Sequence, residues 1–466
     1  MKLLPVGLAI LALIRPALSG EVPRGRSPKC VCCAAFAKDV SLRDKILVPD
    51  TERYDARLRS YYSGNAAQTA WCMVLPTSTE GVSRIVKIIS RHQCPFGIRS
   101  GAHSAWKGSN GVEDGITVDF GHLNTTTYDE KTGIASIQPG ADWESVFSSL
   151  DPNGVTAVGG RASVVGVGGF TTGGGYFFHT NPRGFACDAV TNFEIVLANG
   201  TIVNASAKEN PDLFKAQKGG SGNLGFVTRV DQRVVNTTAM WAGFVEYPVE
   251  ERGAVFNAYL EFSKNMHKDL ASQNIAAMSW GNRAMPTGPS SQTSRAGSDP
   301  PRLRIIWRSA TPRARSGSGR LPRWCPSSPG PRRSVCTKSR QPAPRTPPPE
   351  VLKTDHRVPS ANWMSGQYRD DLRMMQFVDQ KLREYGTMMN KLAPSATYDV
   401  LVQFQPFTKS MVAHAAEGGG NILGLERVVA DGPTTNWLIA LICDTAETQE
   451  KLLRWRCGIG TTLIGA

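Results

Sequence analysis

The sequence lacks several patterns, and each absence excludes a class of protein. Beyond the amino terminus, no segment supplies the roughly 18 apolar residues that a membrane-spanning helix needs, so we expect no membrane partner. No glycine-rich run ends in Gly-Lys-Ser or Gly-Lys-Thr, which excludes the common phosphate loop of nucleoside triphosphatases. No histidine or second cysteine pair follows "CVCC" (residues 30–33) at zinc-finger spacing, which favours disulfides over a metal site.

Acidic residues are absent from one long segment. The formal net charge is +14, but twelve basic and no acidic residues lie between Pro300 and Pro349, so the rest of the chain carries only +2. The basicity therefore gives little support for a nucleic-acid partner. Residues 291–350 are rich in Arg, Pro and Ser, a composition that predicts disorder. Because such an insert is unusual inside a compact domain, our hypothesis is a misread exon or retained intron, with a polybasic nucleic-acid tail as the alternative.

The amino terminus predicts secretion. Residues 1–20 combine a basic start at Lys2, an apolar run over residues 3–14 and small residues before position 20, the pattern of a secretory signal peptide. Secretion permits disulfides among the ten cysteines, and Cys72 and Cys94 bracket a predicted strand and helix. The pairing stays open at this point. Glycosylation sequons, which agree with this route, stand at Asn124, Asn199, Asn204 and Asn236.

Length and periodicity predict two domains. A chain of 466 residues exceeds what one hydrophobic core usually organises. Residues 69–99 alternate as strand, helix and strand, and Asn199-Gly200 predicts a hairpin turn. After residue 238, strands and two long amphipathic helices predict a second domain. We therefore expect an α+β protein with a first domain over 21–238 and a second over 239–290 and 351–466.

Two glycine-rich runs carry the chemistry. "RSGAHSAWKGSN" (residues 99–110) follows a predicted strand and contains the lone His103, and the run over residues 158–188 contains nine glycines. Backbones with small side chains expose N–H groups that bind anions such as a pyrophosphate. Either run alone is as typical of a structural loop. Two runs in one domain favour a large phosphate-bearing ligand.

Four segments together resemble a known family. "IRSGAHS", "VGVGGFTTGGGYFF", "GFACDAV" and "GGSGNLGFVT" resemble the FAD-binding domain of the vanillyl-alcohol oxidase / p-cresol methylhydroxylase (PCMH-type) flavoproteins, and most closely the fungal berberine-bridge-enzyme-like FAD oxidoreductases. The resemblance runs from about Ala67 to Val235. It implies a PCMH-type FAD-binding domain of two α/β subdomains, followed by a substrate domain with an antiparallel sheet and helices.

The resemblance also implies how FAD is bound. His103 would be bonded covalently to the flavin 8α-methyl group, and Ala162 stands where many relatives have a second, cysteine attachment, so a single link is expected. Ala102 replaces a commoner glycine, which is tolerable if its φ is negative and costly if it is not. The other implied cofactor-binding residues are Arg99, Ser100, Gly101 and Ser104 in the first run, Gly166, Gly169, Thr172, Gly173 and Gly175 in the second, and Asp188 and Val196 near the ribose and adenine.

The catalytic base is harder to place. Relatives end in a segment with an Asn-Tyr pair and a Tyr-Gly turn that supplies a tyrosine beside the flavin, and this sequence ends in "LLRWRCGIGTTLIGA". We expect the usual base to be missing. Tyr176 and His179 are the local candidates, although such a tyrosine more often packs and such a histidine more often binds solvent or backbone. "GGGNILGLERV" (residues 418–428) resembles a strand that faces the flavin, or is a plain turn and core strand.

These observations predict a secreted FAD-linked oxidoreductase. We expect an oxidase that takes hydride from an alcohol, carbohydrate or secondary metabolite, with O₂ as electron acceptor, FAD as cofactor and no metal. Two alternatives stay open: a degenerate or truncated flavoprotein without activity, and a secreted basic binding protein without flavin.

Overall fold

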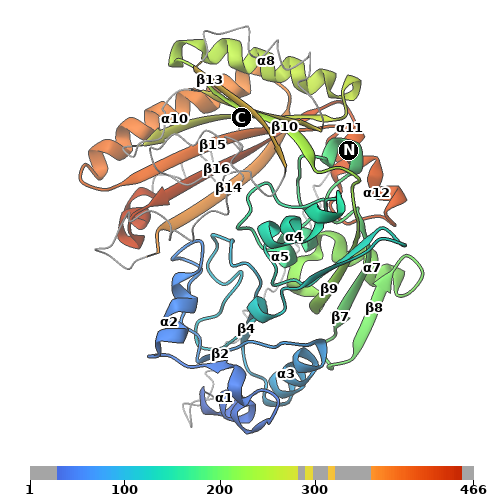
Figure 1. Ribbon diagram of the computed structural model, residues 1–466. Coiled ribbons are helices and arrows are strands. Elements are labelled where there is room, and N and C mark those ends of the chain that lie inside the picture. The colour runs from blue at the N-terminus through green and yellow to red at the C-terminus, as the bar shows by residue number, and fades with distance from the viewer. Residues whose placement is uncertain (1–28, 282–288, 297–312, 321–357, 454–466) are drawn as a thin grey trace, which may run out of the picture.

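The computed structural model describes residues 29–281, 289–296, 313–320 and 358–453. The proposed signal peptide (1–20) and most of the Arg/Pro/Ser-rich segment lie outside these ranges. The described chain forms three sheets with helices packed against them, and this confirms the expected α+β class (Figure 1).

The smallest sheet belongs to the amino-terminal subdomain and has the order β1-β2-β4-β3. Strands β2 and β3 run parallel to β4. Because β2, β3 and β4 are parallel, their carboxyl ends lie at the same edge of the sheet. The first glycine-rich run begins at this edge, directly after β3. The elements are β1 (Ile46–Leu47), β2 (Cys72–Val74), β3 (Phe96–Arg99) and β4 (Ile116–Asp119), with helices α1 (Lys29–Lys38), α2 (Glu52–Arg59) and α3 (Thr79–His92).

The second sheet is antiparallel and has the order β5-β6-β9-β7-β8. The predicted turn at Asn199-Gly200 is confirmed as the connection between β7 and β8, with Gly200 at φ 81°. Its strands are β5 (Thr126–Asp129), β6 (Ile134–Ile137), β7 (Val190–Val196), β8 (Ile202–Ser206) and β9 (Phe226–Arg233), and its helices are α4 (Trp143–Leu150), α5 (Val167–Thr172), α6 (Thr180–Arg183) and α7 (Pro211–Gly220).

The third sheet has seven antiparallel strands in the order β13-β10-β12-β11-β15-β16-β14. Its strands are β10 (Ala239–Glu246), β11 (Ser272–Gly281), β12 (Ser290–Ala296), β13 (Arg313–Arg320), β14 (Ser360–Arg369), β15 (Tyr398–Phe407) and β16 (Thr434–Cys443). Helices α8 (Arg252–Asn265) and α10 (Leu372–Leu392) cover one face, while α4 and α5 lie toward the other (Figure 1). The short helices α11 (Lys409–Val412), α12 (His414–Glu417) and α13 (Leu425–Val428) follow β15.

The prediction of disorder over residues 291–350 is wrong for two stretches, which form most of β12 and the whole of β13. Strand β12 lies between β10 and β11, and β13 pairs with the other edge of β10. Ser291 and Thr293 on β12 are buried. Composition missed β12 because a strand paired on both sides satisfies its backbone groups whatever its side chains, and it missed β13 because that edge strand is held by its pairing with β10. The stretches 297–312 and 321–350 lie outside the described residues.

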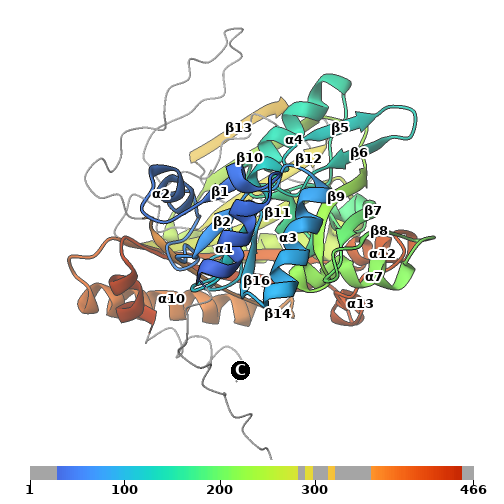
Figure 2. The ribbon, with the colours of Figure 1, turned by 90° about the horizontal axis from the view of Figure 1, so that it is seen from below.

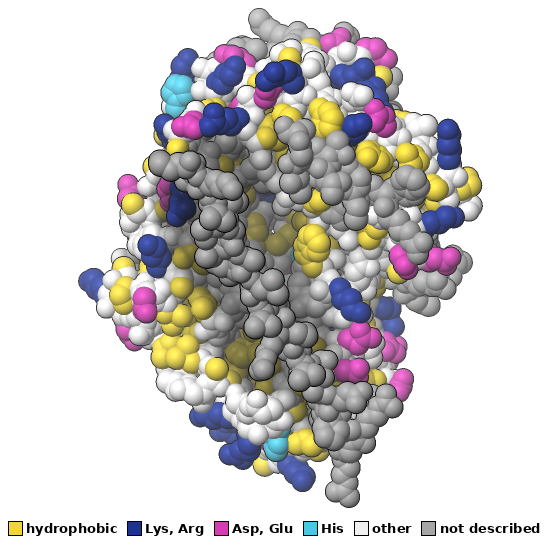
Figure 3. Space-filling view, turned by 180° about the vertical axis from the view of Figure 1, so that it is seen from behind, with side chains coloured by type: hydrophobic (Ala, Val, Ile, Leu, Met, Phe, Trp, Pro, Cys, Tyr) yellow, Lys and Arg dark blue, Asp and Glu magenta, His cyan; other side chains and the backbone are white. Residues whose placement is uncertain are grey.

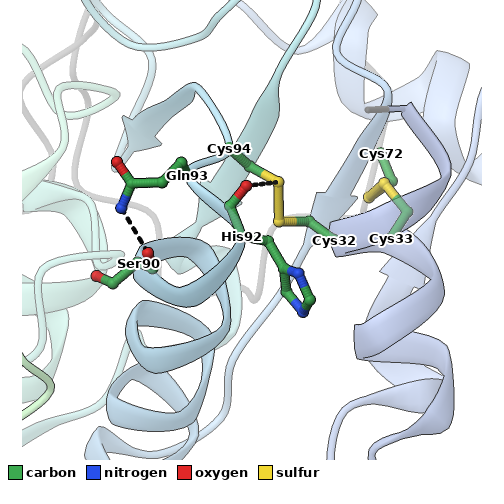
Figure 4. The surroundings of a disulfide bond; sticks show 7 residues. All are labelled: Cys32, Cys33, Cys72, Ser90, His92, Gln93 and Cys94. Atoms are coloured by element: carbon green, nitrogen blue, oxygen red, sulfur yellow. Dashed lines mark hydrogen bonds between the residues drawn. A yellow bond between two sulfur atoms is a disulfide. The ribbon is translucent and has the colours of Figure 1, made fainter. Parts of the chain in front are cut away.

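Two disulfides confirm the expectation from the cysteine cluster. Cys32 bonds to Cys94 and Cys33 bonds to Cys72, so both bridges tie α1 to the strand–helix–strand unit behind it (Figure 4). Helices α1 and α3 lie side by side as a result (Figures 1 and 2). By loop-closure entropy, each bridge stabilises the fold by about 3–4 kcal/mol.

Candidate functional site

The first glycine-rich loop leaves the carboxyl end of β3 with its backbone donors free. Among the described residues, no acceptor pairs with the N–H groups of residues 101–105. Ala102 adopts a left-handed φ of 53° directly after Gly101, and left-handed residues are one component of the backbone turns that bind anions. Further along the loop, the hydroxyl of Ser104 accepts a hydrogen bond from the Ser109 hydroxyl at 2.7 Å. The loop therefore has unpaired N–H donors of the kind that bind an anion.

The positive φ of Ala102 is the costly case that the sequence left open. A left-handed alanine is less stable than a glycine by about 1–2 kcal/mol. The methyl group is buried against Tyr61 and Ala66, which contributes up to about 0.8 kcal/mol. Burial thus offsets a large part of the strain, and the loop tolerates alanine where the family commonly has glycine.

The second loop packs on the first, backbone against backbone. A Cβ atom on Gly101 would lie 2.4 Å from the Gly166 nitrogen. The Ser100 hydroxyl joins the two loops, because it donates to the Pro139 carbonyl at 2.5 Å and accepts from the Gly168 N–H at 3.2 Å. Both contacts need residues without bulk, which explains the glycines at 101, 166 and 168.

Part of the second loop is open. A Cβ atom on Gly169 would meet nothing within 4 Å, and Gly169 and Gly173 are exposed. The Thr171 hydroxyl is buried without a partner in the described structure, whereas the Thr172 hydroxyl donates to the Gly168 carbonyl at 2.8 Å. Gly175 has a structural role, since its φ is 83° and a Cβ atom there would clash with Phe170. The open glycines leave room for a bound group.

His103 lies where the amino-terminal subdomain meets strand β14 of the seven-stranded sheet. Its imidazole stacks on the Tyr62 ring with centroids 4.1 Å apart, and it meets the Trp363 ring of β14 edge to face with centroids 5.8 Å apart. Burial lowers the pKa of His103 below its ordinary value, so the imidazole is neutral at pH 7. Beside it, the Ser63 hydroxyl donates to the Ala361 carbonyl of β14 at 3.1 Å. A neutral, oriented imidazole is suited to act as a nucleophile.

Arg99 holds the base of the first loop and does not point into it. Its guanidinium donates to the Arg57 carbonyl at 2.7 Å and the Ser60 hydroxyl at 2.6 Å, and it lies over the Tyr61 ring. Asp119 lies 3.5 Å from it and accepts two hydrogen bonds from Arg57. Arg99 therefore positions the loop through α2 and β4.

Asp188 and Val196, the residues expected near the ribose and adenine, have protein partners. Asp188 accepts from the Phe185 N–H at 3.0 Å and from Asn421 at 2.8 Å, and burial raises its pKa. Val196 is fully buried in the core beneath α3. Residues 418–424 form a loop and not the expected strand, since Gly419, Gly420 and Gly424 all have positive φ.

The two candidate bases differ in their surroundings. The Tyr176 hydroxyl donates to Gln273 at 2.8 Å and to the Pro406 carbonyl at 3.0 Å, and burial raises its pKa. His179 is buried, packs on Phe177, and has a pKa lowered by burial to about 4. Tyr176 therefore packs between the domains, whereas His179 is neutral and enclosed.

Sequence reasoning missed two polar residues at the site. Asn110, at the end of the first loop, is buried and both atoms of its side-chain amide lack partners in the part of the chain that is described. Arg161 precedes Ala162 in the second loop and reaches Gln405 on β15. A charged residue inside a run of small apolar residues was the available signal for Arg161, and no signal marked Asn110.

The site faces the side of the seven-stranded sheet opposite α8 and α10. Alternate residues of β15, among them Tyr398 and Phe404, pack on the helices α8 and α10, so Gln405 points the other way, toward the glycine loops. Apolar side chains gather around a hollow between the two halves (Figure 3). The two glycine loops therefore form one side of the site, the seven-stranded sheet forms the other, and His103 lies where the two meet.

Other features bear on cofactors and partners. In the described ranges, no group of three His, Cys, Asp or Glu side chains is arranged to hold a metal ion, and no helix there is both long and apolar enough to cross a bilayer. The four sequon asparagines are exposed.

Comparison with known proteins identifies the domain. Residues 70–206 match the FAD binding domain family. The chain is 40% identical over 242 residues to the FAD-dependent monooxygenase drtC of Aspergillus calidoustus, covering 51% of this chain and 46% of that protein. It is 29% identical over 381 residues to the FAD-dependent monooxygenase FUP4 of Fusarium proliferatum, covering 76% and 66%. The chain spans about half the length of most curated relatives it matches.

Solved structures share the fold. The 6-hydroxy-D-nicotine oxidase of Arthrobacter nicotinovorans is 20% identical with a TM-score of 0.63, covering 90% of this chain and 87% of that one. The BBE-like 1 protein of Physcomitrella patens is 18% identical with a TM-score of 0.67, covering 92% and 88%. These matches confirm the flavoprotein resemblance at the level of the FAD binding domain and the fold.

Proposed function

Because the chain carries an FAD binding domain and is homologous to fungal FAD-dependent monooxygenases, we propose that it is an FAD-linked oxidoreductase with covalently attached FAD. The observation that carries the proposal is the contact of the two glycine loops at Gly101 and Gly166, with free N–H groups on one side and His103 at the end. The substrate class is an alcohol, carbohydrate or secondary metabolite, and O₂ is the proposed electron acceptor.

The residues present fit FAD. A pyrophosphate needs several N–H donors and no bulky side chain, and the backbone of residues 101–105 together with the open surface at Gly169 supplies both. The unpartnered Asn110 amide and Thr171 hydroxyl are further polar groups for the cofactor. When bound, FAD supplies the capacity to accept a hydride from the substrate.

The chain's own residues orient and enclose the reaction. His103 is the attachment residue, and the Tyr62 and Trp363 rings hold its imidazole plane. The sheet face that carries Gln405 contacts the second glycine loop through Arg161. Of the two candidates for the base, His179 is neutral and can accept a proton, whereas the Tyr176 hydroxyl is already committed to two acceptors.

Secretion is part of the same proposal. Two disulfides in the amino-terminal subdomain and four exposed sequon asparagines support an oxidising, glycosylating route. Mass measurement of the protein from a eukaryotic host before and after deglycosylation tests this; an unchanged mass contradicts it.

Acid precipitation of the purified protein tests the flavin attachment. We expect yellow, fluorescent flavin to stay in the pellet of the wild type and to move to the supernatant in His103→Ala. His122→Ala, at an exposed histidine, is the matched control and keeps flavin in the pellet. Flavin that washes out of the wild type defeats the covalent link, and a protein that never holds flavin defeats the whole proposal. Peroxide formation on adding candidate substrates then tests O₂ as acceptor.

A further inference from the structure

Arg161 carries a charge without an acidic partner. Its guanidinium donates to the Gln405 side chain and lies 4.7 Å from the centroid of the Tyr176 ring. No carboxylate in the described ranges forms an ion pair with Arg161, whose side chain is half-buried, and burial lowers the pKa of the guanidinium to about 10. Removing an arginine from water without a counter-ion carries a desolvation cost, which an anionic ligand at Arg161 would offset.

A second donor without an acceptor lies beside the same tyrosine. Gln273 on β11 is 3% exposed, and its carbonyl oxygen accepts from the Tyr176 hydroxyl at 2.8 Å. The Nε2 group of that amide has no partner among the residues the structure describes. The Arg161 guanidinium and the unsatisfied Gln273 amide therefore both lie beside Tyr176. A donor-rich cluster of this kind favours an anionic acceptor.

The cluster spans the two domains. Arg161 comes from the second glycine loop, and Gln273 and Gln405 come from the sheet face opposite α8 and α10. It therefore faces the same space as the loops that would hold FAD. A guanidinium offers a planar pair of N–H donors that matches a carboxylate or an ionised phenol.

We propose that Arg161, assisted by Gln273, binds an acidic group of the substrate, a carboxylate or an ionised phenol. This inference rests on the proposed function for the presence of a substrate at the site. The cofactor's own anionic oxygens are the other source of the same chemistry, and the experiment separates the two.

Isothermal calorimetry of the full-length protein with benzoate and with benzamide, its uncharged analogue, tests the proposal. We expect the wild type to bind benzoate about tenfold or more tighter than benzamide, the value of one charge-assisted hydrogen bond. Arg161→Gln removes this preference, and Arg161→Lys restores part of it. Gln405→Leu removes the hydrogen bond between Arg161 and β15 but leaves the positive charge of Arg161. We therefore expect this variant to keep the preference for benzoate over benzamide.

Three outcomes overturn the proposal: the wild type shows no preference for benzoate, Arg161→Gln keeps the preference, or Gln405→Leu loses it to the same extent as Arg161→Gln. The last outcome would make Arg161 only a contact between the domains. If Arg161→Gln keeps the preference and also lowers the flavin content, the anion that Arg161 binds belongs to the cofactor. A wild type without flavin would contradict the proposed function. Calorimetry does not require flavin, so the binding of benzoate to Arg161 is still measured in that case.

Discussion

Gly101 and Gly166 approach so closely that a methyl group on either would lie 2.4 Å from the backbone nitrogen of the other. This contact fixes the first glycine loop on the second and thereby sets the concavity between them. Gly166 has a φ of −76°, a value that any residue adopts. The requirement for glycine at 166 is therefore steric and not conformational.

A pair of alanine substitutions separates fold from cofactor binding. Gly166→Ala forces the loops apart, and we expect a loss of about 1–3 kcal/mol of stability, as for other overpacking changes, together with loss of flavin. Gly169→Ala adds a methyl group to open space in α5, so its melting temperature stays equal or rises slightly while flavin content falls. Thermal unfolding and the flavin-to-protein absorbance ratio check both. Full flavin content in Gly169→Ala would remove Gly169 from the cofactor site.

Asp119 should be the most sensitive charge in the amino-terminal subdomain. It is fully buried and pairs with Arg57, while Arg99, 2% exposed, lies 3.5 Å away. Asp119→Asn leaves Arg99 buried without a counter-ion, and we expect a loss of about 3–5 kcal/mol in the free energy of unfolding. Urea unfolding measures it. Glu130→Gln, at an exposed site, is the control and changes stability by less than about 0.5 kcal/mol; equal effects of the two would contradict the buried network.

The fold was predictable where local pattern and packing agree. The strand–helix–strand unit over residues 69–99 and the hairpin at Asn199-Gly200 follow from apolar periodicity and turn chemistry, and both are present. Strand β12 was not predictable, because "SSQTSRA" has no apolar alternation and is held by pairing on both sides. A different reason explains residues 418–424: Gly419, Gly420 and Gly424 adopt positive φ, so this stretch forms a loop despite its apolar residues.

The site was predictable only in its loops. The glycines of the two loops could be recognised in the sequence because the close contact of two backbone segments, as at Gly101 and Gly166, requires residues without side chains. His103 stands out as the single histidine in the first loop. The role of Arg99 was not visible, since its partners come from α2 and β4 and not from the loop. Gln273 and Gln405 are ordinary glutamines until the sheet brings them to Arg161 and Tyr176.

Lys218 links stability to pH. It is fully buried, donates to the Val190 and Gly418 carbonyls, and has a pKa lowered by burial to about 8, with Cys187, Asp188 and Arg233 as the charged or titratable neighbours. The unfolded lysine has a higher pKa, about 10.4, so between pH 8 and 10 the unfolded chain holds more protons. Stability from this residue therefore rises with pH in that window.

The comparison of wild type with Lys218→Met isolates this effect. Between pH 7 and pH 9 we expect the wild type to gain about 1 kcal/mol relative to the variant, as the penalty for burying the charge is relieved. Lys215→Met, at an exposed lysine of the same helix, shows no such trend. Urea unfolding at the two pH values measures the difference. A gain toward lower pH would mean that Lys218 is stabilised as a cation.

Tyr176→Phe distinguishes a catalytic base from a packed side chain. Removal of a general base lowers the rate of hydride transfer about 10²–10⁴-fold. Because the Tyr176 hydroxyl is held by Gln273 and Pro406 and burial raises its pKa, it is a poor proton acceptor, and we expect a loss of less than about tenfold. The loss of the single hydroxyl proton shared by Gln273 and Pro406 leaves a buried acceptor unsatisfied, which costs about 1–3 kcal/mol of stability.

The measurement is the anaerobic rate of flavin bleaching by a substrate, followed from pH 6 to 10 together with thermal unfolding. Tyr128→Phe, on the distant strand β5, controls for removal of a hydroxyl elsewhere. His179→Gln is the complementary variant, because the neutral imidazole is the better acceptor of the two. If Tyr176→Phe lowers the bleaching rate a hundredfold at unchanged stability, its hydroxyl takes the proton after all, and the contacts with Gln273 and Pro406 must open during turnover.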